Sequence, residues 1–216
     1  MILNPQALFF DFDGVIAQSV GIKTEAFSKL YESHGSAIQQ QVVAYHLAHG
    51  GVSRFEKFRY FEQELMGREP DEMSIDRLST RFSDLVKQGV IGAAPVPGAQ
   101  ELLAYHEGNT PMFVISGTPE VELLEIVQAR GLSHFFEAVR GSPATKEEIL
   151  RDLLDNYGFD SVHCVMLGDA MTDFHAAQTV GVPFVGICPS NGSSPFPRAT
   201  ETYPDLRPLL PSPKVA

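Results

Sequence analysis

Between residues 98 and 188, segments with a helical spacing of apolar residues alternate with short apolar runs. The expected helices cover 98–107, 119–130, 145–157 and 172–180, and the expected strands cover 111–116, 136–140, 162–167 and 183–188. Alternation of this kind favours a parallel sheet with helices on both faces. We therefore predict an α/β fold, with catalytic groups at the carboxyl ends of the strands.

A pair of aspartates follows the first apolar run of the chain. Residues 7–10 have the composition of a short buried strand, and Asp11, Asp13 and Gly14 come directly after it. Carboxylates spaced i, i+2 at a strand end point the same way, and burying two like charges together is costly unless a cation neutralises them. These residues predict a cation site, although a polar turn after a strand would have the same pattern.

Residues 18–92 contain no strand-like run and are predicted to be helical. The apolar spacing indicates helices over 23–33, 39–49, 54–65 and 75–90. The Pro- and Gly-containing segment 93–98 follows as a hinge. We therefore predict two domains: an α/β core formed by residues 1–17 and 93–216, and a small all-helical domain formed by residues 18–92.

The expected strand at 111–116 ends in a hydroxyl group followed by glycine. Thr118 is expected to cap the next helix, with Pro119 at its first position. The Ser116 hydroxyl and the Gly117 amide would then lie at a helix N-terminus, which can hold an anion. A turn hydroxyl without a ligand is the alternative interpretation of Ser116.

Two further motifs stand at the starts of expected helices. Lys146 lies at the start of the helix expected over 145–157, where the helix dipole disfavours a cation. This position predicts an anion or a carboxylate beside the lysine. A solvated lysine is the alternative. Asp169 follows the strand at 162–167, and Asp173 lies four residues further on, so that the two carboxylates share one helix face. Helix capping would also account for these two acids.

Together these four motifs resemble those of the haloacid dehalogenase-like hydrolase superfamily. They occur in its order, and the matching residues are Asp11, Asp13, Ser116, Lys146, Asp169 and Asp173. The resemblance implies a Rossmann-like parallel sheet flanked by helices, with residues 18–92 as a C1-type cap domain. The opening segment 11–27 is similar to the branch that contains phosphoglycolate phosphatase and β-phosphoglucomutase.

The resemblance also implies a role for each acid. Asp11 would be the nucleophile, and Asp13 would act as general acid and general base. A Mg²⁺ ion would be bound by the side chains of Asp11 and Asp169 and by the backbone carbonyl of Asp13. Asp173 would orient metal-bound water from outside the first ligand sphere.

The phosphoryl oxygens would be held by Ser116, Gly117 and Lys146. The acid at position 13 points to phosphoester chemistry, because haloacid dehalogenases lack an acid there. The predicted function is a Mg²⁺-dependent phosphatase that hydrolyses a small phosphorylated metabolite through an aspartyl-phosphate intermediate. A phosphomutase of the β-phosphoglucomutase type is one alternative, and a catalytically silent binding or regulatory protein is another.

The turn between the second and third expected helices is the most unusual part of 18–92. Gly50 and Gly51 permit a sharp turn, and Ser53 with Glu56 has the spacing of a capping box. His46 and its neighbour His49 fit a polar helix face.

Arg54 and Lys57 have no such structural explanation. In C1-capped relatives this turn faces the active site, so the resemblance implies that Arg54 and Lys57 select the substrate. Solvated surface residues are the alternative.

The composition limits the partners. A formal net charge of -11 disfavours nucleic acid and anionic membranes. Cys164 and Cys188 lie in apolar runs, which favours free buried thiols. Without a basic, apolar leader or a membrane-spanning run, a cytoplasmic monomer or homodimer is expected. The Pro-rich tail at 208–213 is expected to be extended or disordered.

Overall fold

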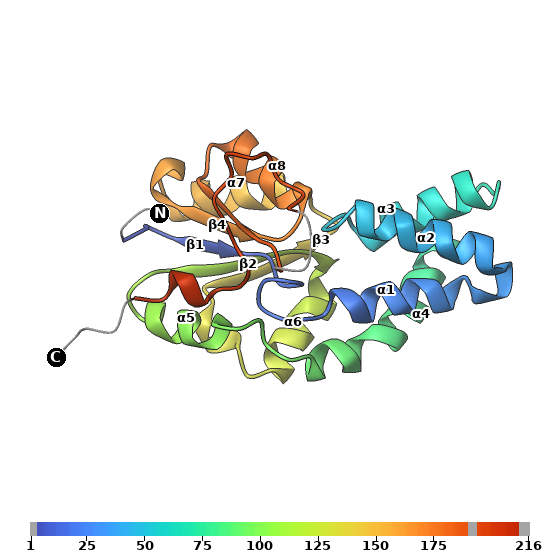
Figure 1. The fold of residues 1–216 in the computed structure, drawn as a ribbon, viewed down its shortest axis with the longest axis horizontal. Coiled ribbons are helices and arrows are strands. Elements are labelled where there is room, and N and C mark those ends of the chain that lie inside the picture. The colour runs from blue at the N-terminus through green and yellow to red at the C-terminus, as the bar shows by residue number, and fades with distance from the viewer. Residues whose placement is uncertain (1–3, 190–193, 212–216) are drawn as a thin grey trace.

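The computed structural model describes residues 4–189 and 194–211, and its centre is a six-stranded parallel sheet (Figure 1). The strand order is β3-β2-β1-β4-β5-β6. The strands are β1 (Leu8–Phe10), β2 (Met112–Pro119), β3 (Ala138–Ser142), β4 (Val165–Gly168), β5 (Phe184–Ile187) and β6 (Thr202–Tyr203). The predicted α/β class is confirmed.

Strand β1 lies at the centre of the sheet, between β2 and β4. Leu8 pairs with Met112 on one side and with Val165 on the other. Phe9 and Phe10 are both fully buried and belong to the hydrophobic clusters on opposite faces. A strand buried on both faces is apolar throughout, which is why this short run could be recognised from the sequence.

Four helices cover the two faces of the sheet (Figure 1). They are α5 (Ala99–His106), α6 (Glu120–Ala129), α7 (Lys146–Tyr157) and α8 (Met171–Val180). Helices α7 and α8 pack on one face, and α5 and α6 lie on the other. A capping box of Thr145 and Glu148 begins α7, and Gly158 ends it in the left-handed conformation.

Residues 18–92 form a helical insertion between β1 and β2, and we use this name below. Its helices are α1 (Val20–Leu30), α2 (Ser36–Ala48), α3 (Arg54–Tyr60) and α4 (Glu72–Gly92), with a π-helical turn at Phe61–Leu65. Short 3-10 turns lie at Glu32–His34, Ser133–Phe135, Ser161–His163 and Arg207–Leu209. Figure 1 shows the insertion beside the carboxyl ends of the central strands.

Aromatic rings fill the interior of the insertion. Phe27 packs against Phe82 and Phe58, with ring centroids 4.3 and 5.5 Å apart. Leu47 and Leu85 contribute to the apolar spacing that predicts the helices over 39–49 and 75–90, but they are 58% and 36% exposed, so their expected place on the apolar faces is wrong. On α2 the imidazole of His46 is buried instead, so its placement on a polar face is also wrong.

The two segments that connect the insertion to the sheet lie side by side. The amide of Gln18 donates to the carbonyl of Ala94, and the amide of Val96 donates to the carbonyl of Ile16. One hydrophobic cluster continues from the sheet into the insertion. The division into two domains therefore stays a prediction, with these paired segments as its proposed boundary.

Three smaller features complete the comparison with the sequence. Strand β6 is not predicted from the sequence. The tail at 208–213 is predicted to be extended or disordered, but a 3-10 turn forms at Arg207–Leu209. Residues 212–213 of this tail lie outside the described residues. Cys164 and Cys188 are free, as predicted, although Cys188 is only half-buried. In the described part of the chain, no helix has the length and apolar character needed to cross a membrane.

Candidate active site

Asp11 lies at the carboxyl end of the central strand. Its amide donates to the carbonyl of Leu167 at 2.9 Å, which fixes the residue between β1 and β4. Its side chain is 3% exposed, and one carboxylate oxygen accepts the amide of Phe12 at 2.7 Å. The other oxygen lies 2.9 Å from Nζ of Lys146. The carboxylate is thus held at the sheet edge in one orientation.

Asp169 follows β4 and lies against Gly14. A Cβ atom at position 14 would lie 2.1 Å from a carboxylate oxygen of Asp169, and Gly14 has a φ of +80°. Both the space and the backbone conformation therefore require glycine. The turn after Asp13 brings the acids from β1 and β4 together.

Asp173 and Lys146 connect the two helices on one face of the sheet. Asp173 is fully buried in the first turn of α8, where it accepts the amide of Ala170 at 3.1 Å. Lys146 donates to Asp173 at 2.5 Å and also contacts Asp11. These carboxylates compensate for a cation at a helix start, which the sequence had indicated.

Asp11, Asp169 and Asp173 form a compact acidic cluster. Each offers a carboxylate oxygen, and these oxygens lie within 4.8 Å of one another. Burial raises the pKa of Asp11 to about 7, and burial together with the neighbouring carboxylates raises the pKa of Asp169 well above its ordinary value. One lysine against several carboxylates leaves excess negative charge, and hard oxygen donors in this arrangement fit Mg²⁺.

Asp13 is held by a different set of partners. Ser19 donates to one of its carboxylate oxygens at 2.6 Å, and Lys23 from helix α1 forms an ion pair with the other. Thr118 donates to Asp13 at 3.3 Å and accepts from Lys23 at 2.7 Å. Burial alone would raise the pKa of Asp13, but Lys23 and Ser19 hold it below its ordinary value.

Ser116 and Gly117 lie near the end of β2. Ser116 is 1% exposed and accepts the amide of Thr118 at 3.2 Å. The predicted helix cap at Thr118 is wrong, because β2 continues to Pro119 and α6 begins at Glu120 with Pro119 in the N-cap position. The Thr118 hydroxyl faces Asp13 and Lys23 instead.

A cavity of about 370 Å³ joins these groups. Its walls include Asp11, Asp13, Ser116 and Asp169 from the sheet side and Lys23 and Lys57 from the insertion. The glycine turn of the insertion lies directly against this side: a Cβ at Gly117 would lie 2.4 Å from the carbonyl oxygen of Gly51, and Thr172 donates to the carbonyl of Gly50 at 3.1 Å. The insertion therefore contacts the sheet side at the cavity.

Arg54 is not a solvated surface residue. It is 4% exposed and donates to both carboxylate oxygens of Glu122 on α6, at 2.6 and 2.9 Å. Ser83 of α4 accepts from Arg54 at 2.7 Å. The predicted cap by Ser53 is wrong, because its hydroxyl is buried with no hydrogen-bond partner among the described residues. Arg54 thus connects the insertion to helix α6, which covers one face of the sheet.

Lys57 is 3% exposed and also lines the cavity. Its Nζ lies 2.9 Å from Nδ1 of His46, whose imidazole is 7% exposed. Burial lowers the pKa of Lys57 to about 7 and that of His46 to about 3. Unlike Arg54, Lys57 has no ion pair with a carboxylate among the described residues.

Residues 8–187 match the model of a protein family described as haloacid dehalogenase-like hydrolase. The chain belongs to this family. The match spans the strands and helices that carry the six residues of the four motifs, so the resemblance drawn from the sequence is confirmed. As a member of the family the protein is a hydrolase.

Relatives agree with this assignment, and solved structures share the fold. A phosphoglycolate phosphatase of Rhodospirillum rubrum is 26% identical over 189 residues, which are 84% of this chain and 78% of the relative. A 5′-nucleotidase of Pseudomonas aeruginosa is 35% identical over 97 residues, and this match spans 43% of each protein. The crystal structure of a β-phosphoglucomutase from Clostridium difficile has a TM-score of 0.69 at 18% identity, covering 87% of this chain and 86% of that one.

The contacts of three residues of this hydrolase site could not be predicted from the sequence. Lys23 and Thr118 are 95 positions apart and meet only at Asp13. Glu122, the partner of Arg54, lies in the first turn of an ordinary amphipathic helix. Their roles depend on how the insertion packs on the sheet layer, which no local pattern encodes.

Proposed function

We propose that the protein is a Mg²⁺-dependent phosphatase that releases phosphate from a small phosphorylated metabolite through an aspartyl-phosphate on Asp11. The observation that carries the proposal is the compact cluster of Asp11, Asp169 and Asp173 beside Lys146, at the carboxyl ends of β1 and β4; Asp11 and Asp173 are buried and Asp169 is partly buried. Phosphatases among the relatives that cover most of the chain support it.

Asp11 would attack the phosphorus atom, and the alcohol would leave on the opposite side. Lys146 and the hydroxyl of Ser116, with the amide of Gly117, would hold the phosphoryl oxygens. Mg²⁺, bound by Asp11, Asp169 and the carbonyl of Asp13, would offset the charge of the phosphoryl group. The buried setting strengthens these interactions, because little water competes for them.

Asp13 would protonate the leaving alkoxide and then remove a proton from the water that hydrolyses the aspartyl-phosphate. In the structure Lys23 and Ser19 favour its ionised form. A phosphoryl dianion bound nearby adds negative charge, which favours a proton on Asp13. Lys23 would therefore position this carboxylate and balance its charge between the two steps.

The helical insertion would act as a cap that closes over the site and excludes water. Contacts of Gly50 and Gly51 with Thr172 and Gly117 support this role, because Gly117 is one of the residues proposed to hold the phosphoryl group. Within the cap, Lys57 lines the cavity without a carboxylate partner among the described residues, whereas Arg54 is paired with Glu122.

Removal of the metal tests this proposal. We expect EDTA to abolish hydrolysis of p-nitrophenyl phosphate and Mg²⁺ to restore it. Asp169→Ala should raise the Mg²⁺ concentration needed for half-maximal activity at least tenfold (an order-of-magnitude estimate) or eliminate activity, because a hard oxygen ligand is lost. The exposed acid Asp155 provides the control, since Asp155→Ala should leave the Mg²⁺ dependence unchanged. Full turnover in EDTA would refute the metal requirement.

Asp13→Asn should slow phosphoryl transfer most for poor leaving groups. An alkyl phosphate needs a proton on its alkoxide, whereas p-nitrophenolate leaves without one. Single-turnover measurements with both substrates would compare the first chemical step directly. We expect a loss of roughly 100-fold or more for the alkyl phosphate and a much smaller loss for p-nitrophenyl phosphate. Equal losses would exclude Asp13 as the general acid.

A further inference from the structure

Lys57 is a buried lysine without a counterion among the described residues. Arg54 and Lys146 are similarly buried, and carboxylates hold each of them. Within residues 4–189 and 194–211, the one polar partner of the Lys57 ammonium is Nδ1 of His46, and the ring of Phe27 lies 5.6 Å away. Burying an ammonium group without an anion is costly, so the site is incomplete as it stands.

His46 carries a second unsatisfied group. Its low pKa keeps the imidazole neutral, so it has one proton. If Nδ1 accepts from Lys57 at 2.9 Å, the proton is on Nε2, which is buried with no hydrogen-bond partner among the described residues. Both residues line the cavity that holds Asp11. Nε2 of His46 is itself buried, so the donors left for a ligand are those of the Lys57 ammonium, which gives one of its three N–H groups to His46.

We propose that Lys57, positioned by His46, binds a second anionic group of the substrate, a carboxylate or a second phosphate on the leaving part of the molecule. The inference rests on the proposed phosphatase function, which assigns the first phosphoryl group to the strand ends. The substrate class is then a small phosphate monoester with a further negative charge. An anion at Lys57 completes the ion pair that the chain itself does not supply.

The charge on Lys57 predicts that substrate selectivity depends on pH. The groups that affect the charge on Lys57 are His46 and Lys23 of the insertion and Asp13, Lys146 and Asp169 on the sheet side. Burial, with Lys23 next, lowers the pKa of Lys57 to about 7, and Asp13 opposes the shift. Lys57 is protonated below this pH and loses its charge above it. Selectivity for a doubly anionic substrate should therefore decline as pH rises through 7.

The first experiment compares three substrates of the wild-type enzyme with Mg²⁺. 2-Phosphoglycolate carries a carboxylate, ethylene glycol bisphosphate carries a second phosphate, and ethyl phosphate has neither. We expect kcat/KM for at least one of the anionic substrates to exceed that for ethyl phosphate by about 100-fold at pH 6.5, and the ratio to fall above pH 7. The ratio of two kcat/KM values removes the pH dependence of the catalytic groups and of the reacting phosphate, because these affect all three substrates alike.

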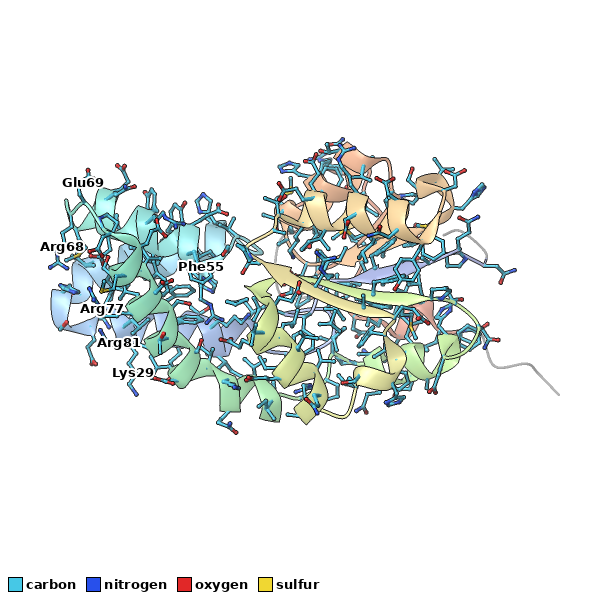
Figure 2. All side chains as sticks on the ribbon, turned by 180° about the vertical axis from the view of Figure 1, so that it is seen from behind. Lys29, Phe55, Arg68, Glu69, Arg77 and Arg81 are labelled. Carbon is cyan, nitrogen blue, oxygen red and sulfur yellow. The ribbon has the colours of Figure 1, made fainter. Side chains whose placement is uncertain are left out.

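Lys57→Met then tests the residue itself. We expect this variant to lower kcat/KM for the preferred anionic substrate about 100-fold and that for ethyl phosphate by less than about threefold, because only the former has a group facing Lys57. Removing a buried unpaired charge should leave Tm unchanged or raise it, which separates the effect from misfolding. The exposed lysine Lys29, labelled on the insertion in Figure 2, provides the matched control Lys29→Met, which should behave as wild type.

The outcomes test the anion subsite and the phosphatase function separately. Hydrolysis of all three substrates at similar kcat/KM, or an equal loss for all three in Lys57→Met, would overturn the anion subsite and leave the phosphatase assignment intact. Wild-type enzyme that hydrolyses neither these substrates nor p-nitrophenyl phosphate would overturn the phosphatase function, on which the subsite depends.

Discussion

Asp11→Asn is expected to abolish phosphatase activity, by roughly 10⁴-fold or more, while the protein stays folded. The amide has nearly the shape of the carboxylate but cannot form the acyl-phosphate. Burial among like charges raises the pKa of Asp11, so the neutral amide relieves repulsion in the cluster. Lys146 retains Asp173 as a partner. Tm should therefore be equal to or above that of the wild type.

The measurement is phosphate release at saturating Mg²⁺, alongside thermal unfolding of the same samples. Asp155→Asn, an exposed acid on α7, is the control for a change of charge outside the site. Activity of Asp11→Asn within tenfold of wild type would contradict the assignment of the nucleophile. Loss of activity together with a collapsed Tm would instead make Asp11 a structural residue.

Arg54→Met is expected to lower the free energy of unfolding by about 3–5 kcal/mol, because it leaves the carboxylate of Glu122 buried without its partner. Two hydrogen bonds between Arg54 and Glu122, together with Ser83, connect α3 and α4 of the insertion to α6. The double variant Arg54→Met/Glu122→Gln should recover much of this loss, because no unpaired charge remains.

Urea unfolding of the single and double variants measures these changes. Arg59 provides a matched control, because it pairs with Glu72 on the surface, where both side chains are well exposed. Arg59→Met should cost less than about 1 kcal/mol. If Arg54→Met cost no more than Arg59→Met, the Arg54–Glu122 pair would have no role in holding the insertion in place.

The fold and the main site could be predicted because their signals are local. Asp11 follows an apolar run in the chain, and Asp169 follows another. Parallel strands align their carboxyl ends, so residues 158 positions apart meet at one edge. A buried central strand is apolar on both faces, and this makes the run visible without any structure.

The face of helix α3 could not be predicted in the same way. The helical spacing over 54–65 comes from Phe55, Phe58 and Phe61. The buried residues of this helix also include Arg54 and Lys57. Periodicity assumes that buried positions are apolar. Here one charged residue is buried because a carboxylate from another layer neutralises it, and the other faces a cavity. Strand β6 was missed because its two residues give no periodic signal.

Phosphoryl transfer to Asp11 can be observed in the Asp13→Asn variant with p-nitrophenyl phosphate. This substrate needs no acid to form the phosphoenzyme, whereas its hydrolysis needs the base that Asp13 supplies. We expect a burst of about one equivalent of p-nitrophenolate per enzyme. Borohydride reduction of the acyl-phosphate should then convert residue 11, and no other aspartate, to homoserine. Two results would contradict the central role of Asp11. One is turnover without a burst and with residue 11 unmodified, and the other is homoserine at a different position.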